Sequence, residues 1–216
     1  MNIVTLYGPD FSYFLRVTAI LCRYKGLPYQ VTLAPYGDVI PPFGEGHKAL
    51  HPYKRMPVLI EGDLVLPESL AIAYYINTKE GPNFLPQSAG STAGCLSLAN
   101  QIALYTHEAL MKNLILEFAF PKGPDKTIRF EWINNHLNDA KSSLLWLEQT
   151  IADSDYLYSN SFTVADAYLI PMLDYLDQMP EQYRLIQEYA GLQQYLSFHR
   201  QQSYCQMVLG PGKPQQ

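Results

Sequence analysis

The sequence predicts an α/β part over residues 1–80 and an all-α part over residues 95–216. In the first part, short apolar runs typical of strands alternate with segments in which apolar residues recur at helical spacing. In the second part, long helical patterns follow one another without strand-like alternation. Residues 81–94 lie between the two parts; they are rich in Gly, Pro and Ser and carry no charged side chain, as expected of a linker.

The first elements of the α/β part are a strand, a helix and a second strand. Residues 3–7 form a compact apolar run, which is typical of a buried strand. Residues 12–24 carry apolar side chains at helical spacing, and Gly26 marks the end of that helix. Residues 29–33 form the second strand, which we expect to be parallel to the first because a helix connects them. Residues 34–46 contain too many Pro and Gly for regular structure.

A hairpin and a helix complete this part. Residues 57–61 and 64–66 are short apolar runs, and the Gly-Asp pair between them is a hairpin signal. Residues 67–79 form a helix with Glu68 and Ser69 in its first turn. In the second part we expect helices over roughly 92–119, 125–152, 163–177 and 181–203, followed by a frayed end over 210–216.

The composition excludes several classes of protein. With 48% hydrophobic and 16% charged residues, the chain is globular rather than disordered. Its net charge is −5 and its Lys and Arg residues are scattered, so we expect no nucleic-acid-binding surface. Cys22, Cys95 and Cys205 are far apart and form no CxxC pair, which indicates a reducing compartment and no zinc site. No apolar run is long enough for export or a membrane span, so we expect a cytoplasmic protein.

Four motifs occur in order along the chain: Ser12–Val17, Lys48–Leu59, Pro67–Ile76 and Ser161–Leu169. Together they resemble the cytosolic glutathione transferase family over nearly the whole chain, most closely its serine-type, zeta-like branches. The resemblance implies a thioredoxin-like N-terminal domain that binds glutathione and an all-helical C-terminal domain for substrate binding and dimerisation. It also implies glutathione as co-substrate, no metal and a homodimer.

Glu68 and Ser69 have the chemistry needed to hold the γ-glutamyl end of glutathione. A helix N-terminus presents unpaired N–H groups and positive partial charge, which favour a carboxylate. Ser69 adds a hydroxyl donor, and Glu68 adds an acceptor for an ammonium group. The simpler alternative is that both residues only cap their helix.

Met56 and Pro57 match the family's cis-proline step. That step implies that the backbone of Met56 pairs with the cysteinyl main chain of glutathione, like an added strand. The simpler alternative is that Pro57 starts an edge strand. Arg55 stands where Gln is usual and is still a competent donor to the glycyl carboxylate. His51 stands where Asn is usual, and we expect a structural role for it.

The family also supplies a basic residue for the glycyl carboxylate from the loop before these positions, but residues 34–46 contain no Lys, Arg or His. His47 and Lys48 are the nearest candidates, with Lys54 as a weaker one. The alternative for His47 and Lys48 is a solvated basic pair.

Ser12 is the preferred residue for activating the glutathione thiol. A hydroxyl directed at the sulfur beside a helix N-terminus stabilises the thiolate and lowers the thiol pKa. Tyr7, at the end of the first strand, is the rival because tyrosine-type branches use a hydroxyl there; Tyr13 is a third option. The structural alternative for Ser12 is an N-cap, and Arg16 is interpreted as structural.

Thr163 and Asp166 form a capping box with Asp in the usual Glu or Gln position. The resemblance implies that this box starts the core helix of the C-terminal domain, so Asp166 has a stabilising role and no part in catalysis.

The functional prediction is a detoxifying glutathione transferase whose thiolate attacks a small hydrophobic electrophile. Two alternatives stay open. One is a non-catalytic binding or scaffold protein on the same fold, as in the translation elongation factor gamma subunit. The other is a glutathione-dependent peroxidase or isomerase. Fold alone does not decide between them.

Overall fold

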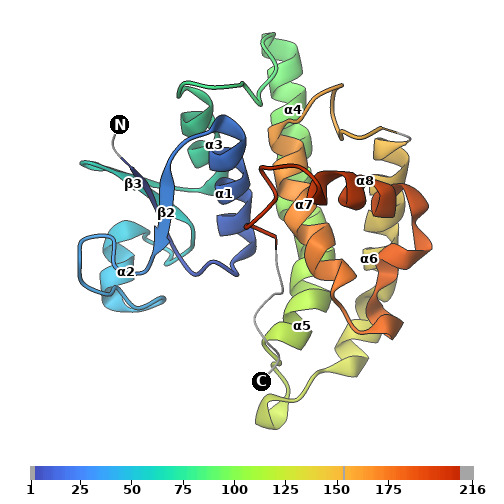
Figure 1. The fold of residues 1–216 in the computed structure, drawn as a ribbon. Helices are drawn as coiled ribbons and strands as arrows, with labels where there is room; N and C mark the ends of the chain where they lie inside the picture. The colour runs from blue at the N-terminus through green and yellow to red at the C-terminus, as the bar shows by residue number, and fades with distance from the viewer. Residues whose placement is uncertain (1–2, 153, 210–216) are drawn as a thin grey trace. The chain divides into compact units, whose positions relative to one another are not determined.

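The structure is a computed structural model, and it describes residues 3–152 and 154–209 (Figure 1). Its contacts group the chain into two compact units. The first unit consists of residues up to 92 together with 202–209, and the second of residues 93–201. All four strands lie in the first unit, whereas the second is helical. The predicted thioredoxin-like α/β fold followed by an all-helical part is therefore confirmed. The frayed end expected over 210–216 lies outside the described residues.

The first unit is built on a mixed four-stranded sheet in the order β2-β1-β3-β4. Strand β1 is parallel to β2 and antiparallel to β3, and β3 forms an antiparallel hairpin with β4. Six elements have the expected order, with bounds within two residues of the expected ones: β1 Val4–Tyr7, α1 Tyr13–Lys25, β2 Tyr29–Thr32, β3 Val58–Glu61, β4 Leu64–Pro67 and α3 Ser69–Asn77. The short helix α2, Glu45–Leu50, is an additional element. The only regular element within the Pro/Gly-rich segment is the start of α2.

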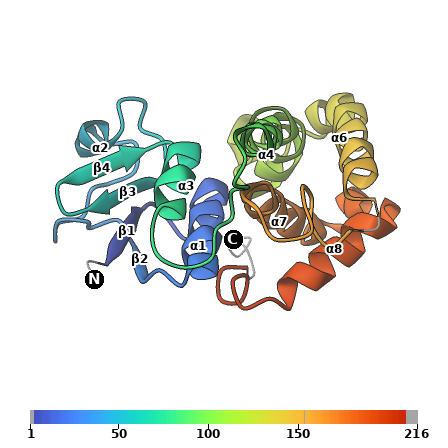
Figure 2. The same cartoon turned by 90° about the horizontal axis from the view of Figure 1, so that it is seen from above.

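The two faces of the sheet are covered by different helices. Side chains alternate along a strand, so Val4 and Leu6 face one side while Tyr7 faces the other. Helices α1 and α3 pack against each other on the same side of the sheet (Figure 2). On the opposite side, a cluster of Tyr7, Leu50, Val58 and Ile60 attaches α2 to the sheet. This cluster also fixes the irregular segments before and after α2, which surround the candidate site.

Helix α1 ends as its sequence predicts. Gly26 adopts the left-handed conformation with φ 71°, which costs glycine no strain, and its N–H donates to the carbonyl of Arg23. The preceding Lys25 is buried, and its ammonium group donates to the carbonyls of Asn77 and Gly81 at 2.9 and 3.1 Å. Lys25 thereby links the end of α1 to the end of α3.

The last described residues return to the first unit. The guanidinium of Arg23 donates to the carbonyl of Ser203 through two nitrogens, at 3.2 and 2.9 Å. The rings of Tyr24 and Tyr204 meet edge to face at 5.5 Å, and Cys205 is buried. The sequence pattern assigns residues 202–209 to the C-terminal domain, but these contacts group them with α1.

The helices of the second unit are α4 Ala89–Gln101, whose first turn groups with the first unit, a π-helical continuation Ile102–Ile115, the short α5 Leu116–Ala119, α6 Phe130–Ile151, α7 Val164–Asp177 and α8 Ala190–Arg200. Helix α4 begins inside the predicted linker, because Ser88 caps it by accepting a hydrogen bond from the N–H of Ser91 at 3.1 Å. Helix α6 begins later than expected, because Asp125 and Lys126 adopt positive φ values of 53° and 60°. None of the described helices is long and apolar enough to cross a membrane.

The single helix predicted over 181–203 is wrong. Two short 3₁₀ turns, Glu181–Tyr183 and Leu185–Glu188, precede α8. Helix α8 starts where the carboxylate of Glu148 on α6 accepts hydrogen bonds from the N–H groups of Gly191 and Leu192 at 2.9 and 2.8 Å. A capping partner that is 43 residues away in the chain leaves no local sequence signal.

The predicted capping box at α7 is confirmed. The Asp166 carboxylate accepts from the N–H and hydroxyl of Thr163 at 2.7 and 2.8 Å. It also accepts from the N–H of Leu157 at 2.7 Å and from the hydroxyl of Tyr195 at 2.8 Å. Complete burial raises the pKa of Asp166, and these four donors oppose that rise. The box therefore joins α7, α8 and the preceding loop.

Replacing Asp166 with Ala is expected to destabilise the protein by at least about 2 kcal/mol, because several buried donors lose their acceptor and each costs about 1 kcal/mol. Urea denaturation measures this loss. Asp139→Ala, on α6, is the matched control and should change stability by less than about 0.5 kcal/mol. Equal effects of the two substitutions would contradict the structural role of the box.

His199 on α8 is buried among aromatic rings, with the Tyr195, Phe198 and Tyr156 ring centroids at 4.3, 5.1 and 5.8 Å. This burial lowers the pKa of His199 to about 3. Between the ordinary histidine pKa of about 6.5 and pH 3, the unfolded chain therefore binds a proton that the folded protein does not. The stabilisation from neutral His199 is complete above pH 6.5 and is lost as the pH falls toward 3.

We therefore expect His199 to contribute a slope of about 1.4 kcal/mol per pH unit to stability within that window. Urea denaturation at several pH values should give a shallower acid slope for His199→Phe than for the wild-type chain. Identical slopes for His199→Phe and wild type would show that His199 ionises while folded.

Candidate functional site

The turn between β1 and α1 leaves the Ser12 hydroxyl uncommitted. The N–H of Ser12 donates to the carbonyl of Pro9 at 3.0 Å, and its carbonyl accepts the first helical hydrogen bond, from Arg16 at 2.9 Å. Ser12 thus occupies the N-cap position, yet its side chain makes no capping hydrogen bond. The residue is half-buried. Its hydroxyl therefore lies at the N-terminus of α1 without capping the helix.

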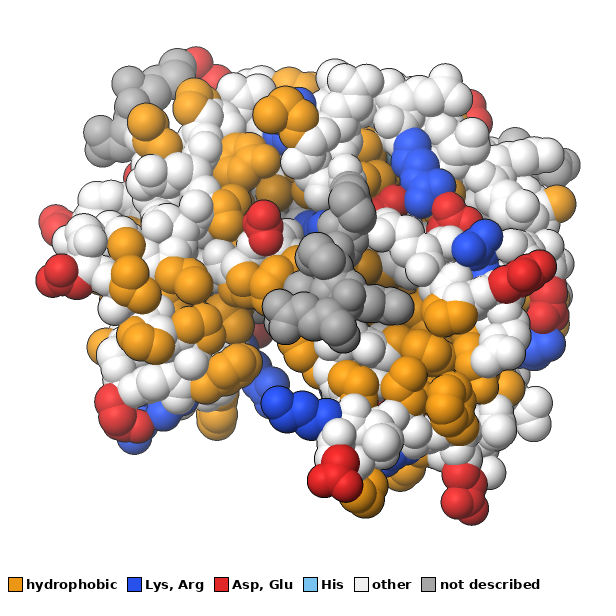
Figure 3. Space-filling view, turned by 60° about the horizontal axis from the view of Figure 1, so that its bottom comes forward, with side chains coloured by type: hydrophobic (Ala, Val, Ile, Leu, Met, Phe, Trp, Pro, Cys, Tyr) orange, Lys and Arg blue, Asp and Glu red, His pale blue; other side chains and the backbone are white. Residues whose placement is uncertain are grey.

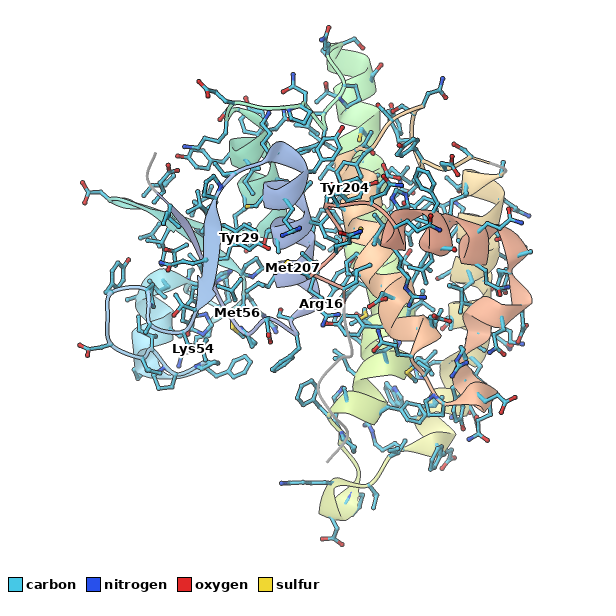
Figure 4. The ribbon with its side chains drawn as sticks, in the orientation of Figure 1. Arg16, Tyr29, Lys54, Met56, Tyr204 and Met207 are labelled. Carbon is cyan, nitrogen blue, oxygen red and sulfur yellow. The ribbon has the colours of Figure 1, made fainter. Side chains whose placement is uncertain are left out.

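This turn is held in place from two sides. The Arg16 guanidinium, buried on α1, donates from Nε to the carbonyl of Asp10 at 3.2 Å (Figure 4). Gly8 has φ 146°, and a Cβ atom there would lie 2.9 Å from Leu15 Cδ1 and 3.3 Å from Met56 Cβ. The absence of a side chain at Gly8 therefore lets the turn approach Met56.

Tyr7 has a different environment from Ser12. Its side chain is fully buried, and its hydroxyl donates to the carbonyl of Ile40 at 2.9 Å. Its ring meets the His47 ring edge to face at a centroid distance of 4.9 Å. Burial also raises the pKa of Tyr7. The hydroxyl proton of Tyr7 is thus used to hold the irregular segment after β2.

The peptide bond between Met56 and Pro57 is cis, as the resemblance implies. Strand β3 begins one residue later, at Val58. Met56 is partly exposed, and its backbone N–H and carbonyl have no hydrogen-bond partner among the residues that the structure describes. Both groups remain available to an extended peptide.

His47 differs from its expected role as a carboxylate ligand. The side chain is fully buried; Nδ1 accepts from the N–H of Phe43 at 3.1 Å and Nε2 donates to the carbonyl of Arg55 at 3.0 Å. Burial lowers its pKa. With both ring nitrogens bonded to backbone, His47 has none left for a ligand and instead fixes the segment that leads to Met56.

The other basic candidates, Lys54, Lys48 and Arg55, differ in whether they already form an ion pair. Lys54 pairs with Glu45 at 2.8 Å. The side chains of Lys48 and Arg55 are exposed, and neither has an ion-pair partner among the described residues. They are the cations of this region that a carboxylate can reach without displacing an existing ion pair.

Glu68 immediately precedes α3 and has an unusual backbone conformation, with φ 72° and ψ 114°. Its carboxylate caps no helical N–H, and its side chain is 72% exposed. The carboxylate is instead bonded through Oε1 to Nε2 of His51 at 3.2 Å. Ser69 is the first residue of α3 and is half-buried. The pair therefore lies at the N-terminus of α3, as expected, but the simpler view of Glu68 as a helix cap does not hold.

The fold and these positions agree with known families. The N-terminal glutathione S-transferase domain matches residues 6–84, and the C-terminal glutathione S-transferase domain matches residues 130–197. The chain belongs to the glutathione S-transferase family. The sequence motifs that predicted this membership all lie in the first unit or at the start of α7.

Individual relatives of this glutathione S-transferase family member are distant. Glutathione S-transferase 3 of Zea mays is 29% identical over 182 residues, which cover 78% of this chain and 77% of that protein. Maleylacetoacetate isomerase of Pseudomonas aeruginosa is 27% identical over 182 residues, 80% of each chain. The relatives include a glutathione S-transferase as well as an isomerase, so membership of the zeta-like branch stays a prediction.

Solved structures of the family share the fold. Poplar glutathione transferase F1 has a TM-score of 0.82 at 18% identity, over 97% of each chain. A glutathione S-transferase of Methylobacillus flagellatus, solved with glutathione bound, has a TM-score of 0.78 at 18% identity, over 96% of this chain and all of that one. Among the described residues, no group of three or more His, Cys, Asp or Glu side chains is arranged to hold a metal ion.

Sequence reasoning missed His51 as part of this site. It predicted only a structural role, because the residue stands where Asn is usual. Its contact with Glu68 spans 17 residues and depends on how β3 and β4 fold back. No local pattern could have indicated that pairing.

Gly8→Ala is expected to destabilise the protein by about 1–3 kcal/mol, because the new Cβ overlaps Leu15 and presses on Met56. Gly37→Ala is the matched control: φ at Gly37 is also positive, at 98°, but a Cβ there meets nothing within 4 Å. Urea denaturation of both variants separates the cost of the clash from that of backbone strain. Equal losses would show that the close approach of Gly8 to Met56 has no energetic consequence.

Proposed function

We propose that this protein is a glutathione transferase in which the Ser12 hydroxyl stabilises the glutathione thiolate for attack on a small hydrophobic electrophile. The observation that carries the proposal is the hydroxyl of Ser12, which lies at the N-terminus of α1 and is not used to cap it. The rival hydroxyl, on Tyr7, is already bonded to Ile40. Tyr13 is buried in the first turn of α1.

The γ-glutamyl end of glutathione is assigned to the start of α3. Its α-carboxylate binds to the N-terminus of that helix and to the Ser69 hydroxyl, because both favour an anion. Its α-ammonium is accepted by the Glu68 carboxylate, which is exposed and has one oxygen, Oε2, without a partner among the described residues. The α-carboxylate and the α-ammonium group of the ligand thus meet groups of opposite charge at two adjacent residues of the chain.

The rest of glutathione is assigned to the cis-proline turn. The cysteinyl main chain pairs with the unbonded N–H and carbonyl of Met56, next to Pro57. Because Gly8 packs against Met56, the turn that carries Ser12 lies beside this position. The glycyl carboxylate is assigned to Arg55 and Lys48, which are exposed and otherwise unpaired in the described part of the chain.

The chemistry follows from thiol ionisation. A free thiol has a pKa of about 8.5 and is mostly protonated at neutral pH. A hydroxyl that donates to the sulfur, together with the N-terminus of α1, favours the thiolate. Lowering the pKa by two units needs about 2.7 kcal/mol, which one charge-assisted hydrogen bond plus the helix dipole can supply. The thiol proton passes to solvent, and the thiolate then forms a bond to the electrophile as the leaving group departs.

We further propose a cytoplasmic homodimer. The three cysteines are buried free thiols, which suits a reducing compartment. Large apolar side chains are exposed on the described surface, including Tyr36, Phe43 and Tyr53 near α2 and Leu104 and Tyr105 in the second unit. Figure 3 shows hydrophobic side chains gathered on one face of the molecule. Such exposed apolar side chains are what a protein–protein interface would cover.

A glutathione-dependent isomerase is the second candidate. It is favoured by the 27% identity to maleylacetoacetate isomerase over 80% of each chain. The same thiolate would add to the substrate and leave again, so the binding assignments above would be unchanged. Product analysis with maleylacetoacetate and with an aryl halide, each with glutathione, distinguishes the two activities.

Ser12→Ala is expected to reduce kcat/KM for conjugation of an aryl halide at pH 7 by about 30- to 100-fold, because the thiol loses its charge-assisted hydrogen bond. The pH profile of kcat/KM should shift upward by one to about two units. Tyr7→Phe is the matched control: it removes the hydrogen bond to Ile40, so it should lower stability and leave the pH profile in place. Unchanged turnover and an unchanged profile in Ser12→Ala would reject the assignment.

Calorimetric titration of the wild-type chain with glutathione tests binding separately. We expect saturable binding that Glu68→Gln weakens, because the amide keeps its shape but lacks the charge that attracts an ammonium group. Absence of binding to the wild-type chain would favour the scaffold alternative.

A further inference from the structure

The imidazole of His51 is held between the backbone and Glu68. Only 2% of its surface is exposed. Nδ1 accepts a hydrogen bond from the N–H of Tyr53 at 3.1 Å, and Nε2 lies 3.2 Å from Oε1 of Glu68. The Tyr53 ring meets the imidazole edge to face at a centroid distance of 6.2 Å. The ring therefore has little freedom to rotate.

The contact with Tyr53 determines which nitrogen of the neutral ring carries the proton. A backbone N–H can only donate, so Nδ1 must be the acceptor and the proton is on Nε2. Nε2 then donates to the Glu68 carboxylate. A neutral donor fixes the position of that carboxylate without cancelling its negative charge, which a lysine or arginine at the same place would do.

For Glu68, a contact that fixes the position of the carboxylate matters. Its backbone has φ 72°, a conformation that non-glycine residues adopt at a cost and that is concentrated at functional sites. Its side chain is 72% exposed, and a glutamate that free would otherwise sample many rotamers. His51 occupies Oε1 and leaves Oε2 with no partner among the described residues. The carboxylate is thus directed and still able to accept a cation.

We propose that His51 is a positioning residue that holds Glu68 ready for the α-ammonium group of a γ-glutamyl ligand. The inference rests on the proposed function, in which Glu68 accepts that ammonium. His51 itself touches no ligand. It reduces the number of side-chain conformations that Glu68 must give up when the ligand binds, so it raises affinity without adding a ligand contact.

The central experiment compares two ligands by calorimetry on the full chain. Glutathione carries the α-ammonium, and its glutaryl analogue, in which hydrogen replaces the amino group, does not. His51→Phe keeps an aromatic ring in the buried position but removes the donor to Glu68. We expect this variant to bind glutathione about three- to tenfold more weakly than the wild-type chain. We expect it to bind the glutaryl analogue as tightly as the wild-type chain does.

A double-mutant cycle tests the coupling to Glu68. Glu68→Gly removes the carboxylate, and glycine adopts the positive φ of this position without strain. In that background, His51→Phe should cost no further affinity for glutathione. His51→Gln, which restores an N–H donor, should recover part of the loss. His136→Phe, on α6, is the control for replacing a histidine and should leave affinity for both ligands unchanged.

A spectroscopic measurement on the wild-type chain does not depend on how the variants fold. Two-dimensional ¹H–¹⁵N spectra of histidine side chains should show the His51 ring with its proton on Nε2 when neutral. Thermal denaturation of each variant shows whether it is folded at the temperature of the titrations.

Three results would overturn the inference. The first is unchanged glutathione affinity in His51→Phe while the wild-type chain binds glutathione, which leaves the proposed function intact. The second is equal weakening for glutathione and the glutaryl analogue, which would give His51 a general structural role. The third is a neutral ring protonated on Nδ1. If the wild-type chain binds neither ligand, the proposed function fails together with the inference.

Discussion

The candidate site depends on two buried imidazoles that bond to backbone groups in the irregular segments before and after α2. Between α2 and β3, the chain has no helix or strand to satisfy its polar groups. His47 accepts from Phe43 and donates to Arg55, and His51 accepts from Tyr53. Buried backbone groups need such partners, because an unsatisfied one costs about as much as a lost hydrogen bond. The conformation of Met56 and the direction of Glu68 both follow from these contacts.

Much of the fold was predictable because it depends on local signals. The apolar runs at β1, β3 and β4, the helical spacing before Gly26 and the Thr163 capping box are all visible within a few residues of sequence. The features that local signals do not indicate have the opposite character. The start of α8 depends on Glu148, and the placement of residues 202–209 depends on Arg23 and Tyr24. Contacts between residues far apart in the chain leave no periodic pattern.

The candidate site was predictable in its positions but not in the state of each side chain. The motifs located Ser12, Met56, Pro57 and the Glu68–Ser69 pair, because family motifs fix residue types at turns. They could not show that the Tyr7 hydroxyl donates to the carbonyl of Ile40, or that both ring nitrogens of His47 are bonded to backbone groups. Whether a polar group has a hydrogen-bond partner depends on which residues lie next to it in the folded protein, and the sequence does not show these residues.

The packing of residues 202–209 against α1 has a consequence for how the chain can be divided. Arg23 and Tyr24 lie on α1, but their partners Ser203 and Tyr204 are 180 residues further along the chain. The first unit therefore completes its packing only with a segment that follows the helices of the second unit. A fragment that stops after residue 94 would lack the groups that contact Arg23 and Tyr24, so the α/β half of the chain is not a separable module.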